Sequence, residues 1–339
     1  MKFVSFRTTA GEERLGLHVD GKVYDMQENA RIVNKTLPST MSEFLWGGDR
    51  LMDEARRLLE DILRGKADLV VQTYTPMAPV PRPTSCRDAY AFRQHVAAAR
   101  RNRGVEMIPE FDQFPIFYFT NHNSIIGEGD CLVECDHLQK LDFELEAAVV
   151  IGRKGKNVAA EEADSFIAGY TIMNDFSARV LQMEEMKLNL GPAKGKDFAT
   201  AIGPWLVTPD ELTDRRIDTP FGRQHDLRMT ATHNGKLVSD GNLKDMTFTF
   251  AEIIERCSYG VEIFPGDVIG SGTVGTGCYL ELNGTRAREA AEQGHAFEPV
   301  WLQDGDTIEL EIENLGSLTN RIVSADRQYS ILARKKNVG

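Results

Sequence analysis

Apolar positions divide the chain into a helical part near the start and a longer part that alternates. Over residues 41–64 they recur at helical spacing, which predicts an amphipathic helix. Residues 1–26 alternate on both sides of Asp20-Gly21, a dipeptide that favours a two-residue turn. The first 64 residues therefore predict a β-hairpin followed by a helix.

Four prolines within residues 76–83 make the next segment an extended connector. Beyond it, short alternating segments are separated by turn residues such as Asn234-Gly235 and Asp304-Gly305-Asp306. Such spacing is typical of a closed or double-layered antiparallel β domain. We expect a mixed, mainly β protein with a small α+β N-terminal domain, residues 1–80, and a larger domain, residues 81–339.

Three segments of the larger domain carry most of its unusual polar residues. Residues 86–103 predict a helix, and residues 141–152 alternate before they become an apolar run. Residues 168–174 predict a strand, and a short helix is expected from Ser177 onward.

Composition excludes several classes of protein. Apolar residues make up 42% of the 339 residues, so the chain can bury a full core. The formal net charge of −12 argues against nucleic acid as the main partner, because phosphate binding needs a basic face. No apolar run reaches the roughly 18 residues of a membrane span. Five cysteines are few for this length and predict a reduced, cytoplasmic protein without membrane partners.

The glycine-rich stretch 270–277 could suggest a phosphate-binding loop. It lacks the Lys-Ser/Thr pair of a nucleotide loop, and no helix is expected to follow it. We therefore interpret it as tight β turns.

Glu144 and Glu146 lie two residues apart at the start of the segment that becomes apolar. Residues i and i+2 of a strand share one face, so both carboxylates, with Asp142, are expected side by side. Like charges this close favour a bound divalent cation with oxygen ligands. The alternative is a solvated strand face, because Glu-x-Glu is common.

Two more acidic residues could join them. Asp175 follows an apolar strand and precedes a short helix, where it could also be a helix N-cap. Asp88 lies seven residues before His95, so on a helix the two would share a face. Its alternative is an exposed position near a helix N-terminus, which the helix dipole favours.

Five motifs follow one another along the chain: RDAYAFRQH, FELEAAVVIG, NDFSARVLQ, KGKDFATAIGPW and PGDVIGSGTVGTG. Together, over about residues 80–335, they resemble the fumarylacetoacetate hydrolase family. The resemblance implies a catalytic β-sandwich roll with short helices and a homodimer. It also implies one divalent metal, here Mg²⁺ with Mn²⁺ or Ca²⁺ as alternatives, and a β-diketo acid or related oxo-acid as substrate.

The resemblance also implies roles for individual residues. The metal ligands would be Asp88, Glu144, Glu146 and Asp175, supported by Lys196 and Thr200. The general base would be His95, oriented by Glu281, while the oxyanion and substrate would be held by Arg179 and Gln182. The remaining substrate contacts would be Tyr90, Tyr118 and Thr273.

These roles suit a metal-dependent hydrolase that cleaves a C–C bond of a β-diketo acid, such as an acylpyruvate from aromatic catabolism. An oxo-acid decarboxylase or keto–enol isomerase on the same fold is the alternative. A non-enzymatic metal-binding oligomer would not need Lys196, Arg179 and Gln182 beside the carboxylates. Met186, where fumarylacetoacetate-cleaving members have a tyrosine, and a shorter N-terminal region argue against fumarylacetoacetate itself.

Overall fold

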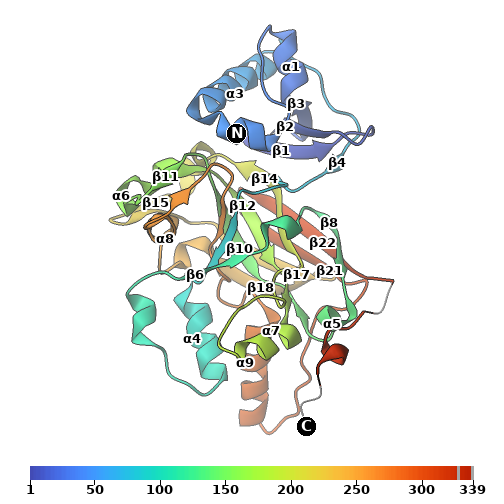
Figure 1. The fold of residues 1–339 in the computed structure, drawn as a ribbon, viewed down its shortest axis with the longest axis vertical. Coiled ribbons are helices and arrows are strands. Elements are labelled where there is room, and N and C mark those ends of the chain that lie inside the picture. The colour runs from blue at the N-terminus through green and yellow to red at the C-terminus, as the bar shows by residue number, and fades with distance from the viewer. Residues whose placement is uncertain (327–328, 337–339) are drawn as a thin grey trace.

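The computed structural model describes residues 1–326 and 329–336, and two β-sheets form its centre (Figure 1). The larger sheet has 11 strands in the order β3-β2-β1-β14-β12-β10-β20-β5-β6, with β4 beside β1 and β7 beside β14. Its strands are β1 Lys2–Arg7, β2 Glu13–Val19, β3 Lys22–Asp25, β4 Thr75–Pro76, β5 Cys86–Ala89, β6 Phe117–Thr120, β7 Ile125–Ile126, β10 Leu145–Ile151, β12 Ile167–Asp175, β14 Thr200–Val207 and β20 Val268–Gly270.

The second sheet has five strands in the order β18-β17-β21-β22-β8. They are β8 Gly129–Val133, β17 Arg228–His233, β18 Lys236–Asn242, β21 Thr307–Ile312 and β22 Gly316–Ser324. Three two-stranded ribbons complete the β structure: β9 Leu141–Asp142 with β13 Ser177–Ala178, β11 Gly155–Lys156 with β19 Glu262–Ile263, and β15 Arg216–Thr219 with β16 Gly222–His225.

Strand β10 is buried along its whole length because both faces of the larger sheet are covered. Val149 and Ile151 belong to the core between the two sheets, whereas Ala148 and Val150 belong to a second core on the opposite face. That second core also contains the apolar sides of three N-terminal helices, α1 Met26–Ile32, α2 Met41–Trp46 and α3 Gly48–Leu63. Successive side chains of a strand point to opposite faces, so an uninterrupted apolar run follows from burial on both.

The remaining helices are short, apart from α9. They are α4 Arg93–Asn102, α5 Cys135–Leu138, α6 Ala160–Ala163, α7 Arg179–Met186, α8 Phe250–Ser258 and α9 Tyr279–Glu292. Helices α4, α7 and α9 gather at the end of the molecule opposite the N-terminal helices (Figure 1). None of the helices in the described part of the chain is both long and apolar enough to span a bilayer.

The expected fold class, a mainly β sandwich with short helices and an α+β N-terminal part, is confirmed. The domain boundary near residue 80 stays a prediction. Strand β1 pairs with β14, so residues from both sides of that position share one sheet. The helix expected over 41–64 is two helices, because Gly48, the first residue of α3, adopts a left-handed φ of 57°.

Two local expectations are wrong. Residues 86–89 form strand β5, not the start of a helix, because β20 and β6 pair with this segment on either side. A helix does follow the glycine-rich stretch, since α9 begins at Tyr279.

Candidate active site

Strand alternation brings the predicted oxygen ligands to one face of the larger sheet. On four strands, a predicted ligand lies two residues from a member of the core under the N-terminal helices, so both share a face. The pairs are Cys86 and Asp88 on β5, Glu146 and Ala148 on β10, Met173 and Asp175 on β12, and Thr200 and Ile202 on β14. The ligands therefore continue this apolar face at the ends of the strands.

Three of these carboxylates form a compact group. Asp88, Glu144 and Glu146 each offer an oxygen within 4.8 Å of the others, and all three are buried. The backbone N–H of Gly272 donates to Asp88 Oδ1 and Glu146 Oε2, each at 3.2 Å. A Cβ at Gly270 would lie 2.5 Å from Asp88 Oδ1, so only glycine leaves room for the acidic triad Asp88–Glu144–Glu146.

The triad carries more negative charge than its surroundings neutralise. Burial, followed by repulsion from Asp175, raises the pKa of Asp88 to about 7. Burial and the charge of Asp88 raise the pKa of Glu146 well above its ordinary value. A divalent cation would remove both penalties, and an all-oxygen donor set suits Mg²⁺, Mn²⁺ or Ca²⁺. The residues present therefore fit the predicted metal.

Lys196 bridges the triad and Asp175. Its Nζ lies 2.5 Å from Glu144 Oε2 and 2.7 Å from Asp175 Oδ2. Burial favours the neutral amine, but Asp175 and Glu144 raise the pKa of Lys196 above its ordinary value, so the lysine stays charged. Asp175 also accepts a short hydrogen bond from the Tyr118 hydroxyl, while its buried Oδ1 has no partner among the described residues. Thr200 pairs with Asp175 across β14 and β12.

Arg179 supplies a second buried positive charge beside the triad. Its Nη2 lies 2.8 Å from Glu144 Oε1, and its Nη1 donates to Gln182 Oε1 at 2.9 Å. Burial alone would raise the pKa of Glu144, but Lys196 and Arg179 lower it to about 2. Glu144 is therefore ionised and is paired with two buried cations.

His95 and Glu281 form the predicted dyad although they are 186 residues apart. His95 Nδ1 lies 2.6 Å from Glu281 Oε2, and both side chains are at most 8% exposed. Glu281 Oε1 also accepts the backbone N–H of Thr276 at 3.1 Å, and Asn102 of α4 donates to the Glu281 carbonyl of α9 at 3.0 Å.

The other predicted substrate contacts lie around these groups. The ring of Tyr90 packs edge-on against His95 at a centroid distance of 5.8 Å. The Thr273 hydroxyl lies 3.4 Å from Glu146 Oε1. The structure thus gathers the predicted residues into one neighbourhood, while their catalytic and ligand roles stay predictions.

The geometry corrects two details of the sequence analysis. Asp88 and His95 do not share a helix face, because Asp88 lies on β5 and His95 on α4. Asp142 is not part of the acidic triad, because the strand is interrupted between β9 and β10; it binds Arg179 instead. Sequence reasoning missed the Gly272 N–H and Asn102, whose contacts depend on the packing of distant segments.

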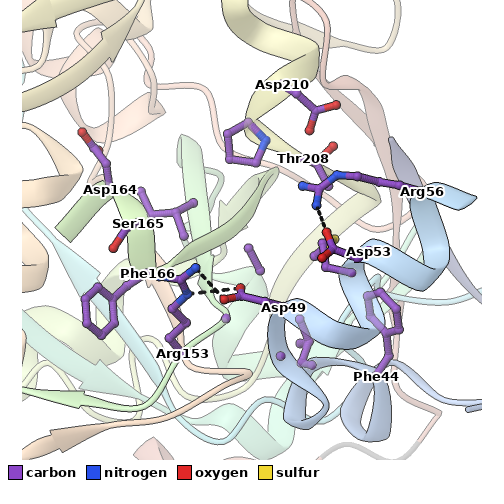
Figure 2. A pocket seen from close by; sticks show the side chains of 17 residues that line it. Phe44, Asp49, Asp53, Arg56, Arg153, Asp164, Ser165, Phe166, Thr208 and Asp210 are labelled. Atoms are coloured by element: carbon purple, nitrogen blue, oxygen red, sulfur yellow. Dashed lines mark hydrogen bonds and ion pairs between the residues drawn. The ribbon is translucent and has the colours of Figure 1, made fainter. Parts of the chain in front are cut away.

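A cavity of about 460 Å³ lies elsewhere, between α3 and the ends of the central strands β10, β12 and β14. Figure 2 shows its charged rim, where Arg153 pairs with Asp49 of α3. None of the predicted site residues lines it, and its acidic and basic groups are already paired or exposed. The predicted site residues gather instead around the triad and the dyad.

The structure thus combines a buried acidic triad that could hold a divalent cation with a buried His–Glu pair, on a β-sandwich. Residues 84–323 match the model of the fumarylacetoacetate (FAA) hydrolase C-terminal family, and the chain belongs to this family.

Relatives and solved structures resemble the chain over most of its length. The chain is 32% identical to human "Oxaloacetate tautomerase FAHD2A, mitochondrial", with 87% of this chain and 83% of the relative covered. It is 28% identical to the Bacillus subtilis oxaloacetate tautomerase YisK, with 91% and 95% covered. Its fold matches fumarylacetoacetate hydrolase from Exiguobacterium antarcticum, with a TM-score of 0.68, 24% identity, and 96% and 100% of the chains covered.

Proposed function

We propose that the protein interconverts the keto and enol forms of a 2-oxo-dicarboxylic acid of the oxaloacetate type, with a divalent cation. The observation that carries this proposal is the buried His95–Glu281 pair beside the acidic triad, because a group that can transfer a proton then lies near a candidate cation-binding centre. The names of the human and Bacillus relatives, both oxaloacetate tautomerases, support the choice of substrate.

Asp88, Glu144 and Glu146 would hold the cation, with Asp175 as the predicted fourth ligand. A bound cation would supply Lewis-acid polarisation of the oxo group. Maleylpyruvate hydrolase from Sphingobium, which shares the fold at a TM-score of 0.66, has been solved with manganese(II) and pyruvate, so we propose Mn²⁺ or Mg²⁺ here.

The protein's own groups divide the remaining work. His95 removes a proton from the carbon next to the oxo group and returns it to the other atom of the keto–enol pair. Glu281 accepts a hydrogen bond from Nδ1–H, which leaves Nε2 free to act as base, and it stabilises the imidazolium that forms. Arg179, Lys196 and Gln182, which lie at or beside Glu144, would stabilise the negative charge on the enol oxygen.

Hydrolytic cleavage of a C–C bond is the second candidate. The same dyad could activate a water molecule for this reaction. Metal-assisted decarboxylation, by contrast, needs no buried His–Glu dyad. A decarboxylase of an oxo-acid is therefore the weaker alternative. The homodimer, the cytoplasmic location and a role in aromatic catabolism stay predictions; the human relative is named as mitochondrial.

A substrate panel tests the proposal. Metal-loaded protein would be incubated with oxaloacetate, acylpyruvates and fumarylacetoacetate, and the products identified by NMR. We expect faster equilibration of the keto and enol forms of oxaloacetate, without a change in total oxaloacetate. Stoichiometric pyruvate from an acylpyruvate would instead establish the hydrolase, and CO₂ release from oxaloacetate the decarboxylase.

A further inference from the structure

Asp142 is a buried carboxylate to which no step above assigns a role, and it is fully saturated with donors. Its side chain is 0% exposed and lies at the end of β9. Oδ2 accepts Arg179 Nε at 2.9 Å, with Nη2 at 2.7 Å, and the backbone N–H of Leu280 at 2.9 Å. Oδ1 accepts the N–H of Tyr279 at 2.7 Å and that of Phe143 at 3.0 Å.

These contacts fix the first turn of α9. Cys278, the residue that precedes this helix, provides no side-chain cap. Asp142 instead accepts two N–H groups that the helix itself leaves unpaired, from a strand 137 residues earlier in the chain. Glu281 lies in the same turn, so Asp142 determines where the Glu281 carboxylate meets His95.

The same carboxylate fixes Arg179 from the opposite side. The Arg179 guanidinium spans Asp142 and Glu144, and its third nitrogen reaches Gln182. Without Asp142, the guanidinium would keep Glu144 and Gln182 but would lose the anchor that holds Nε. An arginine fork is positioned by its acceptors, so its direction depends on that anchor.

We propose that Asp142 is a positioning residue that aligns two separate parts of the machinery, Arg179 and the Glu281–His95 dyad. It touches neither substrate nor cation in this arrangement and acts through the groups it holds. This inference rests on the proposed function for its kinetic consequence, while its geometric part is independent of any substrate.

Asp142→Asn tests the inference because one amide oxygen cannot replace two carboxylate oxygens. Its NH₂ group would face donors whichever way it points, either Arg179 with Leu280 or Tyr279 with Phe143. We expect kcat to fall about 10- to 100-fold, as for other groups that orient catalytic ligands, with KM changed much less. Substrate-free protein should lose the downfield NMR signal of the His95 Nδ1–H that donates to Glu281.

Double-mutant cycles separate the two routes. In an Arg179→Lys background and in a Glu281→Gln background, the effect of Asp142→Asn should shrink, because each background already lacks one route. The matched control is Asp267→Asn, which breaks another buried pair, Asp267–Arg87, together with an acceptor for the Phe264 N–H. The control should keep kcat per folded molecule and the His95 signal.

An effect of Asp142→Asn that is undiminished in either background, or an unchanged His95 signal, would overturn the inference. If the wild-type protein has no tautomerase activity, that result counts against the proposed function alone. The NMR signal of His95 still decides whether Asp142 positions the dyad. If Asp142→Asn does not fold, Asp142→Glu, which keeps the charge but moves it by one methylene, decides by the same readouts.

Discussion

Glu146 bears an electrostatic penalty when no cation neutralises it, since its side chain is fully buried beside Asp88. Burial and the charge of Asp88 raise its pKa in the folded protein, so its ionised form costs stability above the ordinary carboxyl pKa. We expect Glu146→Gln to raise the melting temperature in chelator at pH 8 by at least about 2 °C, the equivalent of roughly 1 kcal/mol. With excess Mn²⁺ the wild-type protein should melt at the higher temperature, because the variant binds the cation more weakly.

Thermal unfolding with and without Mn²⁺, together with calorimetric titration of the metal, would measure both effects. Glu311→Gln is the control, because Glu311 is an exposed strand residue away from the triad. A Glu146→Gln protein that melts below wild type in chelator, and binds Mn²⁺ equally well, would contradict the assignment of the triad.

Residue-scale prediction succeeded where the period of a strand was sufficient. Strand alternation predicted that Glu144 and Glu146 lie side by side, and both belong to the acidic triad. Asp142 could not be placed, because the break between β9 and β10 depends on the pairing of β9 with β13 and not on local sequence. Its contacts with Tyr279 and Leu280 also join segments that no local pattern connects.

Helices α4 and α9 carry the two residues of the dyad, and Gly284 of α9 allows the two helices to pack closely. A Cβ at Gly284 would lie 2.6 Å from Asn102 Nδ2 and 2.9 Å from Asn102 Cβ. Gly284→Ala should therefore push α4 away from α9 and lengthen the contact between His95 and Glu281. A shift of about 1 Å can cost about 100-fold in rate, so we expect kcat to fall about 10- to 100-fold.

Steady-state kinetics of metal-loaded protein would measure this effect. Glu289→Ala provides the control, since Glu289 is exposed on the same helix. Alanine favours a helix by about 1 kcal/mol over glycine, so a Gly284→Ala protein with higher stability and unchanged kcat would show that the helices have room to adjust.

The type of an element could be predicted from the sequence where its hydrophobic period was long. The prediction was wrong where pairing with distant strands determined the local structure. Strand β12 and the hairpin at Asp20-Gly21 follow the sequence pattern. Residues 86–89 do not, because hydrogen bonds to β20 and β6 impose a strand on a segment that continues into a helical pattern. Helix α9 was missed because its apolar side is weak and its cap comes from Asp142.

Two buried histidines should make the whole molecule sensitive to acid. Burial, with help from Arg223 and Arg216, lowers the pKa of His225 to about 4, and burial and Lys194 lower that of His137 likewise to about 4. The unfolded chain, with a pKa near 6.5, therefore binds more protons between pH 6.5 and 4, and stability falls as the pH drops through this window.

We expect His225→Gln to remove up to about 3 kcal/mol of the stability lost between pH 7 and pH 4, at about 1.4 kcal/mol per pKa unit. Denaturant unfolding at both pH values would measure it, with His122→Gln as the control because His122 is exposed. Equal pH dependence in wild type and His225→Gln would contradict a neutral buried His225.

At the scale of the whole molecule, the sequence indicated a mainly β sandwich but not what covers its larger sheet. The uninterrupted apolar run of β10 is explained by the N-terminal helices, whose side chains share a core with Ala148 and Val150. The net charge of −12 likewise does not distinguish the exposed acidic residues from the buried acidic triad. Only folding brings Asp88 of β5 to Glu144 and Glu146 across β20.

The most direct test of the account is the rate of oxaloacetate enol–keto conversion by metal-loaded protein, with and without His95. Enol absorbance would be followed for wild type and His95→Gln, with the Mn²⁺ affinity of both measured by calorimetry. We predict that His95→Gln binds Mn²⁺ as wild type does but slows the conversion about 100- to 10,000-fold, the usual contribution of a general base. Conversion at the wild-type rate by the Mn²⁺-bound His95→Gln protein would contradict it.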